Sequence, residues 1–322
     1  MFCYCCRVAH LVVGGAGVES GSRVSKRVYL LLVLVFCLTW SSAFPAAKLA
    51  ISVGPPLLFL GIRFSIAAML LLGFAAATGR LRAVAGSPIP WLALMALGVI
   101  NQAGYQGLAW MGMRTVSGGL ATIVASLNPV LVAVIAVPVL GERMTWRKIA
   151  GLALGFLGAA FVVRNRIIVT GEDPTGIVLI AIGMVAMTLG TLLYKKIAPK
   201  VDLFVAVGVQ QVGAGLALLL TGGILGEKMS EFVPGPLLWG TMLWFIFVIS
   251  IGAFLLWFTL LRRGTASAAS SLHFLMPPLG LLMSWAALGE TLHPLDLLGI
   301  VPVALGIRLA TTDSVSRKPR QA

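Results

Sequence analysis

Apolar runs, each about long enough to cross a lipid bilayer, follow one another along nearly the whole chain. A membrane-spanning helix needs about 17 to 25 mostly apolar residues. We therefore expect ten spans, at 28–47, 56–77, 91–112, 116–139, 147–164, 175–196, 202–222, 237–260, 265–287 and 295–311. The two runs beside Arg114 count separately, because at about 1.5 Å per residue one helix over 91–139 would be far too long for a single crossing. The pattern predicts an all-α integral membrane protein.

The charged residues support this class and argue against a soluble one. They make up only 11% of the 322 residues, and the mean hydropathy is +1.01, whereas soluble domains have about a quarter of their residues charged. The net charge of +14 comes from Lys and Arg that stand mainly in the short connections between apolar runs. That placement is typical of a topology signal and not of a groove that binds phosphates. We expect the lipid bilayer as a partner and no nucleic acid.

The distribution of basic residues also predicts an orientation. If the N-terminus is cytoplasmic, most basic connections lie on the cytoplasmic side, and the other side holds only Arg114, Arg164, Arg166 and Lys228. We expect a multi-pass protein of the inner or plasma membrane with both termini cytoplasmic. Residues 1–27 and 312–322 are interpreted as a disordered tail and a basic tail on that side. The first apolar run follows Lys26-Arg27 and ends near Ala43, so a cleavable signal peptide is the alternative there.

The two halves of the chain resemble each other. A shift of 148 residues, the separation of Pro129 and Pro277, also superposes Leu140-Gly141-Glu142 on Leu288-Gly289-Glu290. The same shift pairs Arg114 with Arg262, Gly151 with Gly299, Gly158 with Gly306, Trp91 with Trp239, and Lys48 with Lys196. Each half, 28–164 and 175–311, is expected to hold five spans. Because five is odd, the second half enters the membrane from the opposite side, which gives two inverted five-helix repeats of the kind found in secondary transporters.

The two halves of the chain resemble the EamA-type members of the drug/metabolite transporter superfamily. The resemblance rests on Trp40-Ser41-Ser42-Ala43-Phe44-Pro45-Ala46-Ala47-Lys48 and on the two Pro-bearing helices that end in Leu-Gly-Glu, each followed by a Gly-rich helix. It covers about 28–311. The resemblance implies an inner-membrane carrier of small metabolites, often an exporter of amino acids or related compounds.

Polar residues within the spans are the candidates for substrate binding, because such residues tend to face the bundle interior or a wet cavity. Asn101, Gln102, Tyr105 and Gln106 form one broad stripe on the third span. We interpret this stripe as a cavity wall. Hydrogen bonding between helices without any ligand is the alternative.

Arg63 lies about 10 Å into the second span, and the repeat shift places Gln211 at the matching position. A guanidinium at this depth could bind a substrate carboxylate through two hydrogen bonds. Alternatively, the long side chain could extend to the lipid headgroups.

Two further candidates come from the first and ninth spans. His273 titrates near neutrality in water and could couple transport to protons, or it could be a neutral core histidine with a hydrogen-bond partner. Trp40, like Trp257 and Trp285, could flank a site or pack in an apolar interior.

Pro129 and Pro277 are candidate hinges, because each removes a backbone hydrogen bond from its helix. A plain packing kink is the alternative. The glycines at 151, 155 and 158 permit close helix approach, either within the fold or between the protomers of a homodimer.

The acidic residues, the cysteines and the lack of a phosphate-binding loop limit the classes of function that this chain could have. The ten acidic residues form no cluster in or beside a span, which argues against a membrane-embedded transferase with a metal and a diphosphate. Cys3, Cys5, Cys6 and Cys37 have no second group to complete a zinc site, and no phosphate-binding loop is present. We expect no metal, no cofactor and no enzymatic activity. A secondary transporter of a small-molecule substrate is the favoured function, with a membrane enzyme, a passive channel or a lipid scramblase as alternatives.

Overall fold

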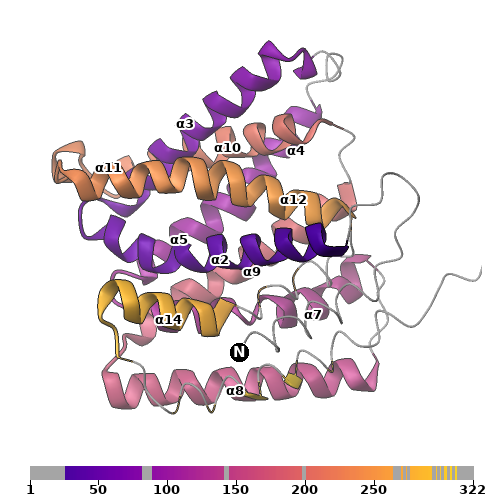
Figure 1. Ribbon diagram of the computed structural model, residues 1–322, viewed down its shortest axis with the longest axis vertical. Coiled ribbons are helices and arrows are strands. Elements are labelled where there is room, and N and C mark those ends of the chain that lie inside the picture. Colours follow the sequence, from indigo (N-terminus) through magenta and orange to yellow (C-terminus); the bar gives the residue numbers. More distant parts are fainter. Residues whose placement is uncertain are drawn as a thin grey trace, which may run out of the picture.

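The computed structural model describes residues 26–81, 89–140, 145–197, 201–263 and 276–291, with isolated positions between 270 and 309. All the regular structure in these residues is helical (Figure 1). The predictions for the two tails and for most of the ninth and tenth spans concern positions outside the described residues.

The helices form a bundle of long segments, some of which are divided into shorter pieces. In chain order they are α2 (Lys26–Ile51), α3 (Pro56–Ala77), α4 (Ile89–Gly98), η2 (Val99–Gly104), α5 (Tyr105–Gly112), α6 (Gly118–Ala125), α7 (Asn128–Leu140), α8 (Trp146–Thr170), α9 (Pro174–Ile197), α10 (Leu203–Ile224), η3 (Met229–Glu231), α11 (Pro236–Leu243), η4 (Trp244–Ala253), α12 (Phe254–Arg263) and α14 (Met276–Leu288). The pieces α4, η2 and α5 form one continuous helical run, as do α11, η4 and α12.

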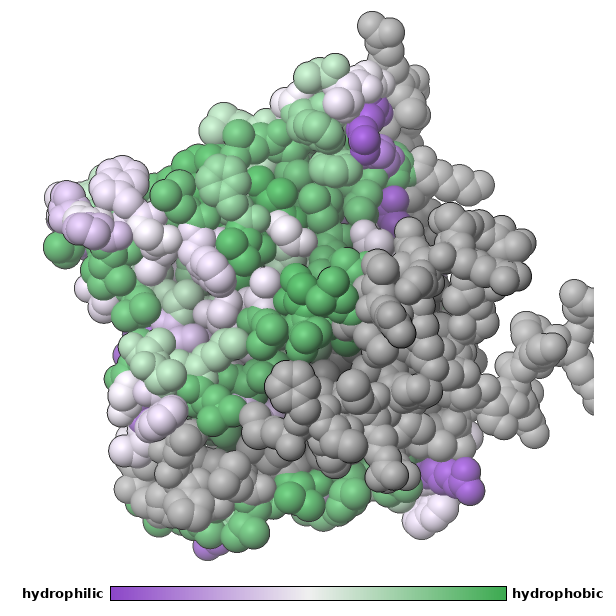
Figure 2. Space-filling view, in the orientation of Figure 1, coloured by the Kyte–Doolittle hydropathy of each residue, from purple (hydrophilic) through white to green (hydrophobic). Residues whose placement is uncertain are grey.

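The prediction of a helical membrane protein is confirmed. Six described helical segments are long and apolar enough to cross a bilayer: Leu31–Ile51, Pro56–Ala77, Gly118–Val139, Pro174–Ile197, Leu203–Ile224 and Pro236–Arg262. Hydrophobic residues cover much of the described surface in Figure 2, and the hydrophilic ones gather mainly near the helix ends. The third predicted span is also helical throughout, but it consists of three pieces. The number of ten spans stays a prediction.

Helix ends differ from the predicted span ends by a few residues. The largest difference is in α8, which continues to Thr170 although the apolar run ends at 164. Arg164, Asn165 and Arg166 end the apolar run but not the helix, because hydropathy limits the membrane-embedded part and not helix formation.

Helices α3 and α10, which the 148-residue shift superposes, pack against each other along their lengths in antiparallel fashion. Gly61 faces Leu219, Gly215 faces Ser65, and Gly208 faces Leu72. Small residues let two helix backbones approach closely within a membrane. The matching segments of the two halves therefore run in opposite directions and contact each other at the centre of the bundle.

The interruptions of the helices also match between the halves. Both η2 and η4 are π-helical, and the shift places η2 inside η4 at 247–252. A turn at Ser126 and Leu127 separates α6 from α7, and Pro129 follows in the first turn of α7. The helix α14, which carries Pro277, begins at Met276, the position that matches the start of α7. Whether these prolines act as hinges stays a prediction.

We predict that Gly98→Ala destabilises the protein by about 1–3 kcal/mol, the usual effect of overpacking. A methyl group at Gly98 would overlap the backbone carbonyl of Gln210 on α10, which cannot move aside without shifting the helix. Gly73→Ala is the matched control, because nothing lies within 4 Å of its added methyl group. Thermal unfolding of the detergent-purified variants checks this. Equal melting temperatures would contradict the close approach of α4 and α10.

Candidate functional site

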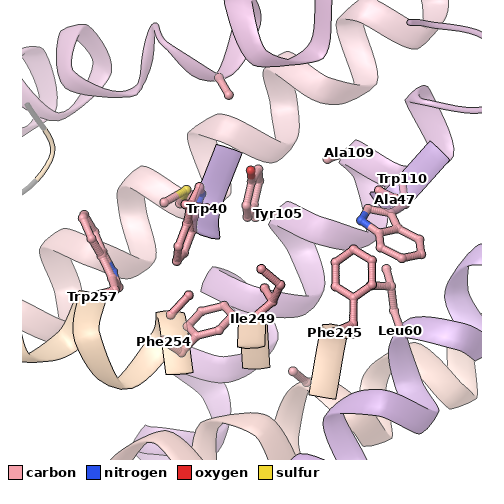
Figure 3. Close-up of a cluster of buried hydrophobic side chains, with 14 of the residues drawn as sticks. Trp40, Ala47, Leu60, Tyr105, Ala109, Trp110, Phe245, Ile249, Phe254 and Trp257 are labelled. Atoms are coloured by element: carbon pink, nitrogen blue, oxygen red, sulfur yellow. The ribbon is translucent and has the colours of Figure 1, made fainter. Parts of the chain in front are cut away.

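A small cavity of about 30 Å³ lies between α2, α5 and η4. It is lined by Trp40, Ala43, Phe44, Ala47, Tyr105, Gln106, Ala109, Trp110, Met113, Phe245 and Ile249. The volume suffices for about one water molecule. Figure 3 shows Trp40 and Tyr105 in the middle of this region, with Trp110 and Phe245 on one side and Phe254 and Trp257 on the other.

Helical periodicity brings these side chains together. On α5 and the turn after it, Tyr105, Ala109 and Met113 are four residues apart and therefore lie on one face. Trp40, Phe44 and Ala47, which are four and three residues apart, share one face of α2. Five of the eleven lining residues are aromatic, and Gln106 is the one with a polar amide side chain.

Arg63 of α3 lies directly behind the cavity wall. Its side chain is fully buried, and its Nη2 donates a hydrogen bond to Oε1 of Gln106. Its Cζ lies 4.4 Å from the ring centroid of Phe245, 4.5 Å from that of Phe64 and 5.4 Å from that of Trp110. Such distances allow cation–π attraction. Because Arg63 does not reach the surface, the alternative that it extends to the headgroups is wrong.

The predicted polar stripe is divided by the π-helical segment. Tyr105 and Gln106, which follow η2, line the cavity, as does Trp40. Asn101 instead packs against Gly190 of α9, and neither Asn101 nor Gln102 is part of the lining. A π-helical turn adds one residue to the helix and so changes the direction of the side chains on either side of it.

Gln211 and His273 are not part of the cavity lining. Gln211 donates from Nε2 to the backbone oxygen of Ser250 in η4. His273 is buried, its Nδ1 lies 3.1 Å from the carbonyl oxygen of Ser270, and its ring contacts those of Phe36, Trp40 and Trp257. These surroundings favour the core-histidine alternative, and a proton-coupling role stays a prediction.

Sequence reasoning missed several residues of the cavity wall. Phe44, Trp110, Phe245 and Ile249 are apolar, so a search for polar residues within spans passes over them. The sequence did offer one signal for the π-helical segments. Gly104 and Gly252 are separated by the same 148 residues, and both lie at the end of a π-helical segment.

Equivalent helix pairs of the two halves are packed differently. The contact of α5 and η2 with α9 is lined by glycines: Gly112 faces Gly176, Gly183 faces the backbone of Tyr105, and Gly190 faces Asn101. We call this contact the glycine seam. Here the helices approach closely, because glycine contributes no side chain to the contact.

The matching contact joins α2 to η4 and α12 and is filled with aromatic rings. We call it the aromatic seam, formed by Phe36, Trp40, Phe254 and Trp257. The ring centroids of Phe36 and Trp257 are 5.8 Å apart, and those of Trp40 and Phe254 are 5.4 Å apart. By the repeat shift, Ala109 stands in the first half where Trp257 stands in the second. The cavity borders the aromatic seam through Trp40.

One end of the cavity lies under the turn between α5 and α6, which several charged groups hold in place. Lys48 donates from Nζ to the carbonyl oxygens of Met113 and Val116, at 2.8 and 3.1 Å. Glu290 accepts from the backbone N–H groups of Gly118 and Gly119, at 2.8 and 2.9 Å, and so caps the N-terminus of α6. Carboxylates at a helix N-terminus are stabilised by its free N–H groups and its dipole.

Glu172 and Asp173 hold the same turn from the side of α9. Glu172 accepts from the backbone N–H of Ser117 at 3.0 Å, and Asp173 accepts from the Thr115 hydroxyl at 2.9 Å. At the opposite end of the bundle, Lys195 donates to the carbonyl oxygen of Leu261, the residue that matches Met113. A lysine therefore caps the same carbonyl position in both halves.

A larger hollow of about 520 Å³ opens on the outside of the bundle between α2, α11 and α14. It is lined by Ser42, Pro45, Ala46, Leu49, Pro236, Leu237, Gly240, Thr241, Trp244, Met283, Ala286 and Ala287. The lining holds no charged side chain, so this hollow suits lipid chains better than a polar solute.

Comparison with known proteins agrees with these features. Helices of membrane-spanning length, in two halves with matching interruptions, define a multi-pass membrane protein with an internal duplication. The model of the EamA-like transporter family matches the chain twice, at residues 27–164 and 174–312, and the chain belongs to this family.

Its relatives include proteins described as transporters. The uncharacterized transporter YvbV of Bacillus subtilis (strain 168) is 31% identical over 92% of this chain and 95% of its own. A probable terminal-alkyne amino-acid exporter of Streptantibioticus cattleyicolor is 27% identical over 92% and 97%. The uncharacterized inner membrane transporter YedA of Escherichia coli (strain K12) is 25% identical over 84% and 87%. One crystal structure matches with a TM-score of 0.67 at 20% identity, over 88% of this chain and 96% of that one, which shows the shared fold.

We predict that Glu290→Gln destabilises the protein by about 1–3 kcal/mol, because it removes the charge from hydrogen bonds to two helix N-terminal amides. Glu231→Gln is the matched control, since Glu231 is exposed and accepts only a local hydrogen bond from Lys228. Thermal unfolding of the purified variants measures both. A Glu290→Gln variant as stable as the control would contradict the capping role.

We also predict a pH-dependent contribution from Asp173, which lies just before α9. Hydrogen bonds from the backbone N–H of Thr175 and from the Thr115 hydroxyl hold the pKa of the Asp173 carboxyl below its ordinary value. A lowered carboxyl pKa stabilises the fold above the unfolded-state pKa, and this stabilisation is lost as the pH falls through the folded-state pKa. The difference in melting temperature between the wild type and Asp173→Ala should therefore be full at pH 7 and shrink in acid. A difference that is constant between pH 7 and pH 3 would contradict this.

Proposed function

We propose that this protein is a secondary transporter that exports a small metabolite across the inner or plasma membrane by alternating access. In this proposal ten spans form two inverted five-helix repeats, both termini are cytoplasmic, and the substrate binds in the cavity between α2, α5 and η4. Trp40, Tyr105 and Gln106 contact it there. The family membership and the exporter among the relatives support transport and its direction.

The observation that carries the mechanism is the different packing of equivalent helix pairs. Inverted repeats give a transporter two states of similar structure, one open to each side, when the halves exchange conformations. The glycine seam and the aromatic seam occupy matching positions, yet one is closed by backbone contact and the other by large side chains. We propose that the aromatic seam is the one that opens from this state.

In the same proposal, the turn between α5 and α6 closes the outer end. Lys48 and Glu290 come from α2 and from the end of α14, so they tie two further helices to this turn. Opening toward the outside would require these hydrogen bonds to break, and the Lys195 contact with Leu261 is the matching bond at the inner end.

Asn101, Gln102, Gln211 and His273 have a different proposed role. They lie outside the cavity lining, and two of them bridge helices: Gln211 contacts η4, and Asn101 packs on α9. We propose that they hold the π-helical segments, while Pro129 and Pro277 allow their helices to bend.

The test is transport by the purified protein in liposomes. A thermal-shift screen of amino acids, amines, nucleosides and sugars should find a ligand that raises the melting temperature, and that ligand should show saturable counterflow. Trp40→Ala should weaken its binding at least about tenfold, since a large buried aromatic contact is lost. Trp285→Ala is the matched control, because Trp285 lies exposed on α14. Flux that does not saturate would indicate a channel, and turnover of added lipid would indicate an enzyme.

A further inference from the structure

Arg63 is a buried cation without a counter-ion among the residues that the structure describes. Its Nε and Nη1 have no hydrogen-bond partner, and no carboxylate of the described residues lies within ion-pair distance of it. The sequence offers none at this depth either, because all ten acidic residues stand outside the predicted spans or at their first two positions. A guanidinium that is buried without a compensating charge destabilises a protein strongly.

The groups around Arg63 attract its charge but do not neutralise it. Phe64, Trp110 and Phe245 offer ring faces, and Gln106 offers one neutral oxygen. Three of these residues, Gln106, Trp110 and Phe245, also line the cavity. The guanidinium therefore lies behind side chains that also face the cavity, and it is not itself part of the lining.

From this arrangement we infer that the cavity binds the carboxylate of an organic acid at Arg63, so that the protein carries organic acids with a short apolar body. This inference rests on the proposed transport function and specifies its substrate class. A carboxylate matches the planar fork of a guanidinium through two parallel hydrogen bonds. It would supply the missing negative charge and use the two nitrogens that lack partners.

In this state the cavity holds only about one water molecule. The ligand body would therefore be held by the same walls after the proposed opening of the aromatic seam has widened the cavity. Its walls are Trp40, Phe44, Phe245 and small or apolar residues of α2 and α5, which suit an aliphatic or aromatic body. No acidic side chain lines it, so an ammonium group finds no opposite charge there. The site therefore distinguishes its ligands by their acid group.

A phosphate could also bind a guanidinium, but the site suits it less well. A phosphate ester carries up to two negative charges and three strong acceptor oxygens, whereas one arginine and one glutamine amide lie at this site. The repeat adds no second cation at the matching position, because Gln211 stands there. One monovalent anion per chain fits the charges present.

The experiment uses four probes that share one isobutyl body: 4-methylpentanoate, leucine, 3-methylbutylamine and 4-methylpentanamide. Calorimetric titration of the full-length protein in nanodiscs gives their Kd values. We expect both carboxylates to bind at least about tenfold more tightly than the amine and the amide, since a charge-assisted pair contributes at least that factor. Amine or amide binding equal to that of the carboxylates, or no binding of either carboxylate, would overturn the inference. So would tighter binding of 3-methylbutyl phosphate.

The variants test the residue itself. Arg63→Gln introduces the side chain that the other half already carries at this position, and we expect it to weaken carboxylate binding at least tenfold while amide binding is unchanged. Arg63→Lys keeps the positive charge but lacks the planar guanidinium. Its affinity for carboxylates should therefore lie between those of the wild type and Arg63→Gln. Arg80→Gln is the matched control, since Arg80 lies at a helix end and pairs with Asp202. Wild-type affinity for carboxylates in Arg63→Gln would contradict the assignment, and if that variant does not fold, the probe series on the wild type still decides.

Counterflow in liposomes distinguishes this inference from the proposed function. Carboxylates that bind in an Arg63-dependent way but are not exchanged would contradict transport and leave the anion site in place. Saturable counterflow of the amine or the amide, with no preference for carboxylates, would contradict the anion site and leave the transport function in place.

Discussion

The structure depends on the close antiparallel contact between α3 and α10. This contact is possible because glycine and serine stand where the two helices cross, at Gly61, Ser65, Gly208 and Gly215. Lipid provides no hydrophobic driving force between helices, so backbone proximity and van der Waals packing have to hold them together. Since α3 and α10 are matching segments of the two halves, the contact that joins the halves is also the one that sets them in opposite directions.

The cavity is asymmetric although the architecture around it is duplicated. Its lining comes from α2, α5, the turn after α5, and η4, and the charged group behind it belongs to the first half alone. Duplication accounts for the shared helix breaks, whereas the lysines that cap Met113 and Leu261, Lys48 and Lys195, stand one position apart in the repeat. The two halves have diverged at matching positions, where the first half has Arg63 and Ala109 and the second has Gln211 and Trp257. The proposed ligand site uses the features in which the halves differ.

Hydropathy and self-comparison predicted the helical membrane class and the family, because both depend on patterns that recur over many residues. The same patterns located Arg63, Tyr105, Gln106 and Trp40, three of which line the cavity. They could not locate Phe245 or Trp110, since an aromatic residue in an apolar span gives no local signal. Nor could they predict that Asn101 and Gln102 lie outside the lining, because that depends on the π-helical turn, which changes the helix phase in the middle of the stripe.

The contrast between the two seams has a consequence for how each can separate. Where glycines lie against the backbone of the neighbouring helix, few rotatable side chains stand in the contact, so it leaves little room for gradual adjustment. Where indole and phenyl rings fill the gap, each ring has rotamers of its own. In the proposed transport cycle, the glycine seam would therefore act as a rigid joint, and the aromatic seam would adapt its width to the size of the ligand.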